Sequence, residues 1–310
     1  MKYLSTFEGL ESLPKKIDYF LMCASYEDRT LTFYDQIEDS RINKFKLFYF
    51  KEFLKYTEIN IKKYENKFNI SKYILSISSP ISIADSLVEC FSDLERKSNV
   101  VVDISTFTRE SILIILKYLS LNSDKFSEIY FFYRCANVSS DLSSIVRQIR
   151  SVLGYMGELE EYKPLHLVLL SGFEISRAKE IIDTIEPDYI SIGFGDKDKS
   201  ISTGLFEINK DFTEKIISYY RNEEVLNIFN HSLIDIYEVK KTILNLVDKN
   251  PSHNFVVVPL SNKLSTVGAG LAALENSKIQ LCYSEVENYN IDNYSQIMDE
   301  CFVELLNFNS

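Results

Sequence analysis

Short apolar runs rich in β-branched and aromatic residues alternate along the chain with longer amphipathic stretches. This alternation is typical of βα units, in which helices bury both faces of a mostly parallel sheet. Helical patterns lie over 83–94 and 110–119, for example, where apolar residues recur at three- and four-residue spacing. In the first half of the chain, the predicted strands are 19–23, 45–50, 73–77, 100–104 and 129–133.

The pattern starts again after a predicted helical connection over 142–153 and a polar break over 157–163. The strands predicted in the second half are 165–170, 189–193, 225–229, 255–258 and 279–283. We therefore expect an α/β protein made of two tandem Rossmann-like units, residues 1–157 and 158–310, each with a mostly parallel sheet and flanking helices.

The two halves also share local sequence. The first predicted strand of one half leads into Tyr26, Glu27 and Arg29, and that of the other half leads into an aromatic residue, Glu174 and Arg177. The fourth strands read Val-Val-Val-Asp-Ile-Ser over 100–105 and Val-Val-Val-Pro-Leu-Ser over 256–261. This local similarity predicts an internal duplication, and the alternative is chance matching of short apolar runs.

Composition limits the partners of the chain. Its 310 residues are 45% hydrophobic, and a net charge of −11 opposes attraction to the phosphate backbone of bulk nucleic acid. A few local cations can still hold a small anion. No run approaches the roughly 18 to 20 apolar residues of a membrane span, and the start does not resemble a signal peptide, so we expect a cytoplasmic protein without membrane contact.

Five scattered cysteines include no C-x-x-C pair. We therefore expect neither a disulfide framework nor a metal site, and no cofactor motif is convincing. The segment Gly268–Ala273 does match G-x-G-x-x-A, but about nine residues separate it from the preceding strand. Its small residues are better explained by close packing of a helix against the sheet. Gly193 and Gly195 follow a strand directly but lack the third small residue.

Cations and hydroxyls gather directly after the predicted strands. In parallel α/β sheets, ligands bind beyond the carboxyl ends of the strands, where helix N-termini favour anions. Each residue alone has an ordinary alternative role as a helix cap or in a local ion pair. As a set, they predict a site for a phosphate-bearing ligand, with Ser25, Glu27, Arg29, Ser78, Ser79, Asp103, Ser105, Thr106, Thr108, Arg109, Glu174, Arg177, Ser261, Asn262, Lys263 and Thr266 as the binding residues.

The most specific segment is Asp103–Glu110, a strand end that leads into a helix through Ser and Thr, with 259–268 as its counterpart. It resembles the CRISPR-associated Rossmann-fold (CARF) domains and the related SAVED sensors, whose fourth strand ends in a polar turn that holds a nucleotide phosphate. This chain departs from that pattern in two places. Phe107-Thr108-Arg109 replaces the Gly-Thr-Lys turn, and Pro259 occupies the acidic position.

The resemblance implies a sensor that binds a nucleotide signal in bacterial antiviral defence and regulates a partner protein; a homodimer is compatible with it. The alternative is an enzyme of nucleotide metabolism that hydrolyses or cleaves a nucleotide, nucleoside or dinucleotide. Its acid–base candidates are Glu27, Asp103, Glu174 and His231. Because the H-E-x-x-H, G-x-S-x-G and P-loop motifs are all absent, we favour the sensor.

Overall fold

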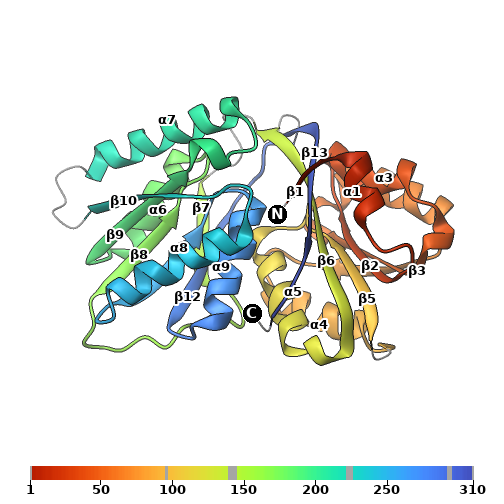
Figure 1. Cartoon of the computed structure of the whole chain (residues 1–310), viewed down its shortest axis with the longest axis horizontal. Helices are drawn as coiled ribbons and strands as arrows, with labels where there is room; N and C mark the ends of the chain where they lie inside the picture. Colours follow the sequence, from red (N-terminus) through yellow and green to blue (C-terminus); the bar gives the residue numbers. More distant parts are fainter. Residues whose placement is uncertain (1, 95–96, 139–144, 221–225, 292–294, 309–310) are drawn as a thin grey trace. The chain divides into compact units, whose positions relative to one another are not determined.

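The structure is a computed structural model that describes residues 2–94, 97–138, 145–220, 226–291 and 295–308. The chain forms two compact units (Figure 1). Unit 1 contains residues 1–137 and 295–310, and unit 2 contains residues 138–294. Each has a mostly parallel sheet with flanking helices, which confirms the predicted fold class.

The sheet of unit 1 has the order β1-β13-β6-β5-β2-β3-β4. Strands β6, β5, β2, β3 and β4 run parallel to one another, whereas β1 and β13 pair antiparallel. The strands are β1 (Lys2–Ser5), β2 (Ile17–Ala24), β3 (Ile42–Phe50), β4 (Ile70–Leu75), β5 (Ser98–Asp103), β6 (Phe126–Val138) and β13 (Ser295–Leu305).

Helices cover both faces of this sheet (Figure 1). On one face, Phe20 of β2 and Leu47 of β3 share an apolar cluster with Ile61 and Tyr64. The helices are α1 (Thr6–Ser12), α2 (Thr32–Gln36), α3 (Leu54–Lys67), α4 (Pro80–Cys90) and α5 (Arg109–Leu121), with short 3-10 turns η1 (Asp28–Leu31), η2 (Asp39–Arg41), η3 (Lys51–Phe53) and η4 (Ser123–Lys125).

The sheet of unit 2 has the order β10-β9-β8-β11-β12-β7, and only β7 in it pairs antiparallel among the described residues. Its strands are β7 (Val146–Ser151), β8 (Leu165–Leu170), β9 (Tyr189–Gly195), β10 (Leu226–His231), β11 (Asn254–Pro259) and β12 (Ile279–Val286). Its helices are α6 (Ile175–Ile185), α7 (Thr203–Tyr220), α8 (Ile236–Lys249) and α9 (Lys263–Glu275), with the 3-10 turn η5 (Lys197–Lys199).

The parallel strands of the two units follow the same order. Numbered along the chain, the first to fifth strands are β2 to β6 in unit 1 and β8 to β12 in unit 2. Both sheets then read 3-2-1-4-5, with the first strand beside the fourth. This is the arrangement of doubly wound nucleotide-binding folds, and it supports the predicted internal repeat.

The division between the units differs from the predicted boundary at 157/158. After the fifth strand of each unit, the chain enters the sheet of the other unit. Strand β7 follows β6 in the sequence but pairs with β12, and β13 follows β12 but lies beside β6. Residues 138–157 therefore belong to unit 2, and 295–310 return to unit 1.

The prediction of a helical connection over 142–153 is wrong for the residues that the structure describes. Residues 146–151 form strand β7, and 142–144 lie outside the described residues. Val146 and Ile149 have helical spacing, but Ile149 packs against the apolar cluster of unit 2 from an antiparallel edge strand. Strands β1 and β13 were not predicted either.

Gly268 on α9 allows close packing, as predicted, but its neighbour is a helix and not the sheet. A Cβ atom at Gly268 would lie 2.6 Å from the carbonyl oxygen of Ile236 and 2.6 Å from the Cβ of Val239, both on α8. Only glycine therefore permits this contact between α8 and α9.

The five cysteines are buried thiols, without disulfide bonds. Among the described residues, the helices are all too short or too polar to cross a membrane.

Candidate functional site

Each sheet has a switch point where the first and fourth strands lie side by side, at β2 and β5 in unit 1 and at β8 and β11 in unit 2. The connections that leave these two strands go to opposite sides of the sheet, and ligands of open α/β folds bind in the resulting crevice at the carboxyl ends. Most of the predicted binding residues lie in the loops at these two switch points.

In unit 1, hydrogen bonds and an ion pair hold the loop after β2 in place. The backbone N–H of Ser25 donates to Thr30 Oγ1 at 3.2 Å, and its carbonyl accepts from Asn60 Nδ2 of α3 at 2.9 Å. Glu27 and Arg29 form a buried ion pair with an N–O distance of 2.8 Å. Ser295 Oγ also donates to Glu27 at 2.5 Å.

Arg29 connects this loop to the fifth strand. Its Nη1 donates to the carbonyl of Arg134 at 3.1 Å, and its guanidinium lies 5.9 Å from the ring centre of Tyr133. The N–H of Arg134 donates in turn to Ser105 Oγ at 2.8 Å. Glu27, Arg29 and Ser105 therefore belong to one buried network, in which the hydrogen bonds and the ion pair described above are made with other protein groups.

Strand β5 ends at fully buried Asp103, whose Oδ1 accepts from the N–H of Ser105 at 2.9 Å in the loop that follows. Thr106 Oγ1 donates to the carbonyl of Cys23 at 2.5 Å, which joins the loop after the fourth strand to the end of β2. These contacts give Asp103 and Thr106 structural roles at the base of the switch point.

Helix α5 begins at the outer edge of the same loop. Thr108 is its N-cap and accepts from the N–H of Ser111 at 3.2 Å, and Arg109 is its first residue. Both side chains are partly exposed. The positive end of a 13-residue helix dipole and a guanidinium therefore lie together at the rim.

The loop after β4 brings Ser78 and Ser79 to the same end of the sheet. Ser79 is the N-cap residue of α4, which starts at Pro80, and Ser78 is exposed. Ser78 Oγ lies 3.2 Å from Ser76 Oγ, and Ser76 Oγ donates to a carboxylate oxygen of Glu52 at 2.6 Å. No sequence pattern predicted Glu52 as a site residue.

Unit 2 repeats the first-strand contacts of unit 1. Arg177 forms a 3.0 Å ion pair with Glu174, donates to the carbonyl of Ser284 on the fifth strand, and lies 5.9 Å from the ring centre of Tyr283. Asn209 of α7 donates to the carbonyl of Ser171 at 3.0 Å, as Asn60 does to Ser25 in unit 1. Burial alone would lower the pKa of Arg177, but the carboxylate of Glu174 raises it, so the pair stays charged.

The loop after the fourth strand of unit 2 also resembles the loop after the fourth strand of unit 1. Asn262 is the N-cap of α9 and accepts from the N–H of Ser265 at 2.8 Å, and Lys263 is the first helical residue. Lys263 therefore occupies the position of Arg109 in unit 1. Ser261 and Thr266 are buried, and Thr266 Oγ1 donates to the carbonyl of Asn262 at 3.2 Å.

Of the catalytic candidates, His231 lies at the end of β10 and is 2% exposed. Its Nδ1 is 3.0 Å from the carbonyl of Ser232, so we assign the proton to Nδ1. Nε2 is buried and has no hydrogen-bond partner among the described residues. Burial lowers the pKa of His231 to about 4, which makes the ring a neutral group at pH 7.

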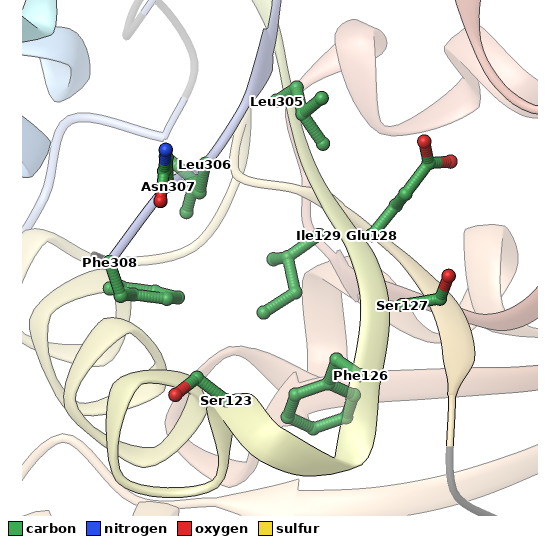
Figure 2. Close-up of a pocket in the computed structure, with 9 residues that line it drawn as sticks. All are labelled: Ser123, Phe126, Ser127, Glu128, Ile129, Leu305, Leu306, Asn307 and Phe308. Carbon is green, nitrogen blue, oxygen red and sulfur yellow. The ribbon is translucent and has the colours of Figure 1, made fainter. Parts of the chain in front are cut away.

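Two of the cavities among the described residues lie elsewhere within the units. One of about 250 Å³ is lined by Asn230, His231 and a polar stripe of α8 that includes Glu238 and Lys241. The other, of about 350 Å³, lies at the amino end of β6, where Phe126, Ile129, Leu306 and Phe308 line it (Figure 2). This second cavity is at the opposite end of the sheet from the predicted site. In the described part of the chain, no group of three His, Cys, Asp or Glu side chains is arranged to hold a metal ion.

No family model and no curated protein matches the sequence. Among solved structures, the chain is similar to the cytoplasmic domain of a prokaryotic cation chloride cotransporter, with 12% identity over 89% of this chain and 99% of that one and a TM-score of 0.26. It is also similar to a periplasmic solute-binding protein of an ABC transporter from Actinobacillus succinogenes 130z with bound D-allose (10% identity, 86% and 77% coverage, TM-score 0.24). A periplasmic sugar-binding protein from Pseudomonas fluorescens gives 8% identity, 84% and 66% coverage and a TM-score of 0.23. TM-scores this low do not indicate a shared arrangement of the whole chain.

Proposed function

We propose that each unit binds a phosphate-bearing small molecule at the loop after its fourth strand, and that the protein is a sensor whose ligand occupancy regulates a partner protein. One observation carries this proposal. In both units, a cation is the first residue of the helix that follows the fourth strand, directly after a polar N-cap.

The position of these cations favours an anion. Arg109 and Lys263 stand at the switch point, where the positive end of a helix dipole adds to the side-chain charge. Thr108 and Asn262 contribute further polar atoms beside them. A phosphate group suits this combination of a charged donor and a helix N-terminus.

The contacts of the acid–base candidates support binding rather than catalysis. Glu27 and Glu174 are engaged in ion pairs with Arg29 and Arg177, respectively. Asp103 is fully buried at the strand end. A ligand that enters at the rim would meet the helix N-termini first.

The resemblance to CARF and SAVED proteins leads us to propose a nucleotide as the ligand and bacterial antiviral defence as the context. The polar turns over 103–110 and 259–268 are the segments that carry this resemblance. A sensor releases its ligand unchanged, whereas an enzyme changes its mass during turnover.

The proposal is tested by mass spectrometry of molecules released from the purified, heat-denatured protein, followed by calorimetric titration of the ligand so identified. Removal of a charge-assisted phosphate contact weakens binding by roughly 1.5 to 3 kcal/mol, about ten- to a hundredfold. We expect this loss in Arg109→Ala and Lys263→Ala. Lys62→Ala, which removes a 65% exposed charge on α3, should bind like the parent. Parental affinity in all three variants would exclude the fourth-strand loops as the site.

A further inference from the structure

Glu52 is an exposed carboxylate held in a fixed position at the carboxyl end of β3, the second strand of unit 1. It belongs to the short turn η3 directly after that strand. Its Oε1 accepts from Ser76 Oγ at 2.6 Å and from the N–H of Ile77 at 3.2 Å, both in the loop after β4. These two bonds orient the carboxylate between the loops that follow the second and third strands.

A chain of hydroxyls supports the same carboxylate. Because Ser76 Oγ gives its proton to Glu52, Ser78 must donate in the 3.2 Å contact between the two serine hydroxyls. Within the described residues, Oε2 of Glu52 accepts no hydrogen bond and makes no ion pair. In the Glu52 carboxylate, Oε1 is therefore held by the protein and Oε2 is available to accept from a ligand.

Two aromatic rings lie at the same end of the sheet as this carboxylate. Phe53 follows Glu52 directly, and Tyr26 lies in the loop after β2. Their ring centres are 5.5 Å apart with an interplanar angle of 81°, and both side chains are only partly buried. Phe53 also packs against buried Phe50, which anchors the pair to the sheet.

This combination has a specific chemistry. In doubly wound sheets, an acidic residue at the end of the second strand accepts hydrogen bonds from ribose hydroxyls. Aromatic rings provide surfaces on which nucleobases stack, for about 1 to 3 kcal/mol per base. We infer that the loops after β2, β3 and β4 form a nucleoside subsite, in which Glu52 binds a ribose hydroxyl and Tyr26 with Phe53 holds the base. The inference rests on the proposed function, which supplies only the phosphate end of the ligand.

Unit 2 does not repeat this arrangement among its described residues. The acidic residue after its second strand is Asp196, whose Oδ1 caps the turn η5 by accepting from the N–H of Asp198 at 3.0 Å. Phe173, the counterpart of Tyr26, pairs with Phe212 from within helix α7 at 6.4 Å. We therefore assign the nucleoside subsite to unit 1 alone.

Calorimetric titration of the full chain with three probes tests the ribose contact: ATP, 2′-deoxy-ATP and inorganic tripolyphosphate. The parent should bind ATP about tenfold more tightly than 2′-deoxy-ATP, because the deoxy probe lacks a hydroxyl that donates to the carboxylate. Glu52→Gln can still accept from Ser76 and Ile77. This variant should lose the preference for ATP without a change in affinity for 2′-deoxy-ATP. Glu58→Gln, which changes a 57% exposed carboxylate on α3, should keep the preference.

A second measurement tests the base contact independently. The chain contains no tryptophan, so Tyr26→Trp creates a single fluorescent reporter. A stacked base should quench this fluorescence on addition of ATP, and tripolyphosphate should not. Tyr162→Trp, at a side chain that is 95% exposed, should respond to neither probe.

The outcomes separate this inference from the proposed function. Equal affinity of the parent for ATP and tripolyphosphate, with no quenching of Tyr26→Trp, would overturn the nucleoside subsite and leave phosphate binding intact. Equal loss of ATP and 2′-deoxy-ATP binding in Glu52→Gln would also overturn the ribose contact. If the parent binds neither ATP nor tripolyphosphate, the proposed function fails, and the subsite fails with it.

Discussion

Buried His231 makes the stability of unit 2 sensitive to acid. Its pKa is lowered to about 4 by burial, whereas an unfolded histidine titrates near 6.5. Below pH 6.5, this histidine is protonated in the unfolded chain but stays neutral in the folded protein. The free energy of unfolding therefore decreases as the pH falls from about 6.5 towards 4. The loss expected from His231 between pH 7 and pH 5 is on the order of 2 kcal/mol.

His231→Asn should remove the contribution of His231, because an amide can still donate to the Ser232 carbonyl but does not titrate. His166, whose pKa is also lowered to about 4 by burial, should keep its own contribution in this variant. Urea unfolding at pH 7 and pH 5 measures the difference. The chain has three histidines, so NMR can also follow the His231 resonances directly, and they should stay those of a neutral ring at pH 5. An unchanged difference between the two pH values in His231→Asn would show that this side chain is not the cause.

The sequence predicted the positions of side chains better than it predicted their contacts. Arg29 was expected at a strand end because parallel strands bring their carboxyl ends to one edge of a sheet. Its bond to the carbonyl of Arg134 joins residues 105 positions apart, and no local pattern predicts it. Glu52 was missed because a single acid in a charged turn has no distinctive sequence signal. Whether the predicted set binds a ligand stays a prediction.

At the scale of elements, the contact between α8 and α9 depends on Gly268. Gly268→Ala would place a Cβ 2.6 Å from a backbone oxygen of α8, which cannot move without displacing the helix. Overpacking of this kind costs typically 1–3 kcal/mol, and we expect a decrease of about that size in the free energy of unfolding. Denaturant unfolding followed by circular dichroism measures it.

Gly204 provides the matched control, because it lies in the first turn of α7 and a Cβ there would meet no atom within 4 Å. Gly204→Ala should be neutral or stabilise the protein by up to about 1 kcal/mol, since alanine favours helix. Equal destabilisation by both substitutions would mean that helix packing does not explain the effect at Gly268.

Strand prediction succeeded for β2 to β6 and for β8 to β12, and it failed at β1, β7 and β13. Interior parallel strands are buried on both faces, so they read as continuous apolar runs such as Val100–Val102. Strand β7 is an antiparallel edge strand with the sequence Val-Arg-Gln-Ile-Arg-Ser, in which polar residues interrupt the apolar ones. Its pairing with β12 is a long-range contact, and that contact rather than local propensity determines its structure.

At the scale of the molecule, each half of the sequence contributes one strand to the sheet of the other half. Unit 2 nevertheless occupies one continuous segment, residues 138–294, which includes β7 and every partner strand described in its sheet. Unit 1 requires two segments, because β13 returns to it from the end of the chain. The compact units and the sequence repeats therefore have different boundaries.

This exchange predicts which fragment folds. Residues 138–294, expressed alone, should be monomeric in size-exclusion chromatography and unfold cooperatively in urea, because the fragment keeps its whole sheet. Residues 158–310 should aggregate, since they lack β7, leave the edge of β12 unpaired and carry β13 without β6 or β1. Both fragments contain the repeat from β8 to β12, so a difference between them isolates the exchanged strands. Equal solubility and stability of the two fragments would show that β7 contributes little to unit 2.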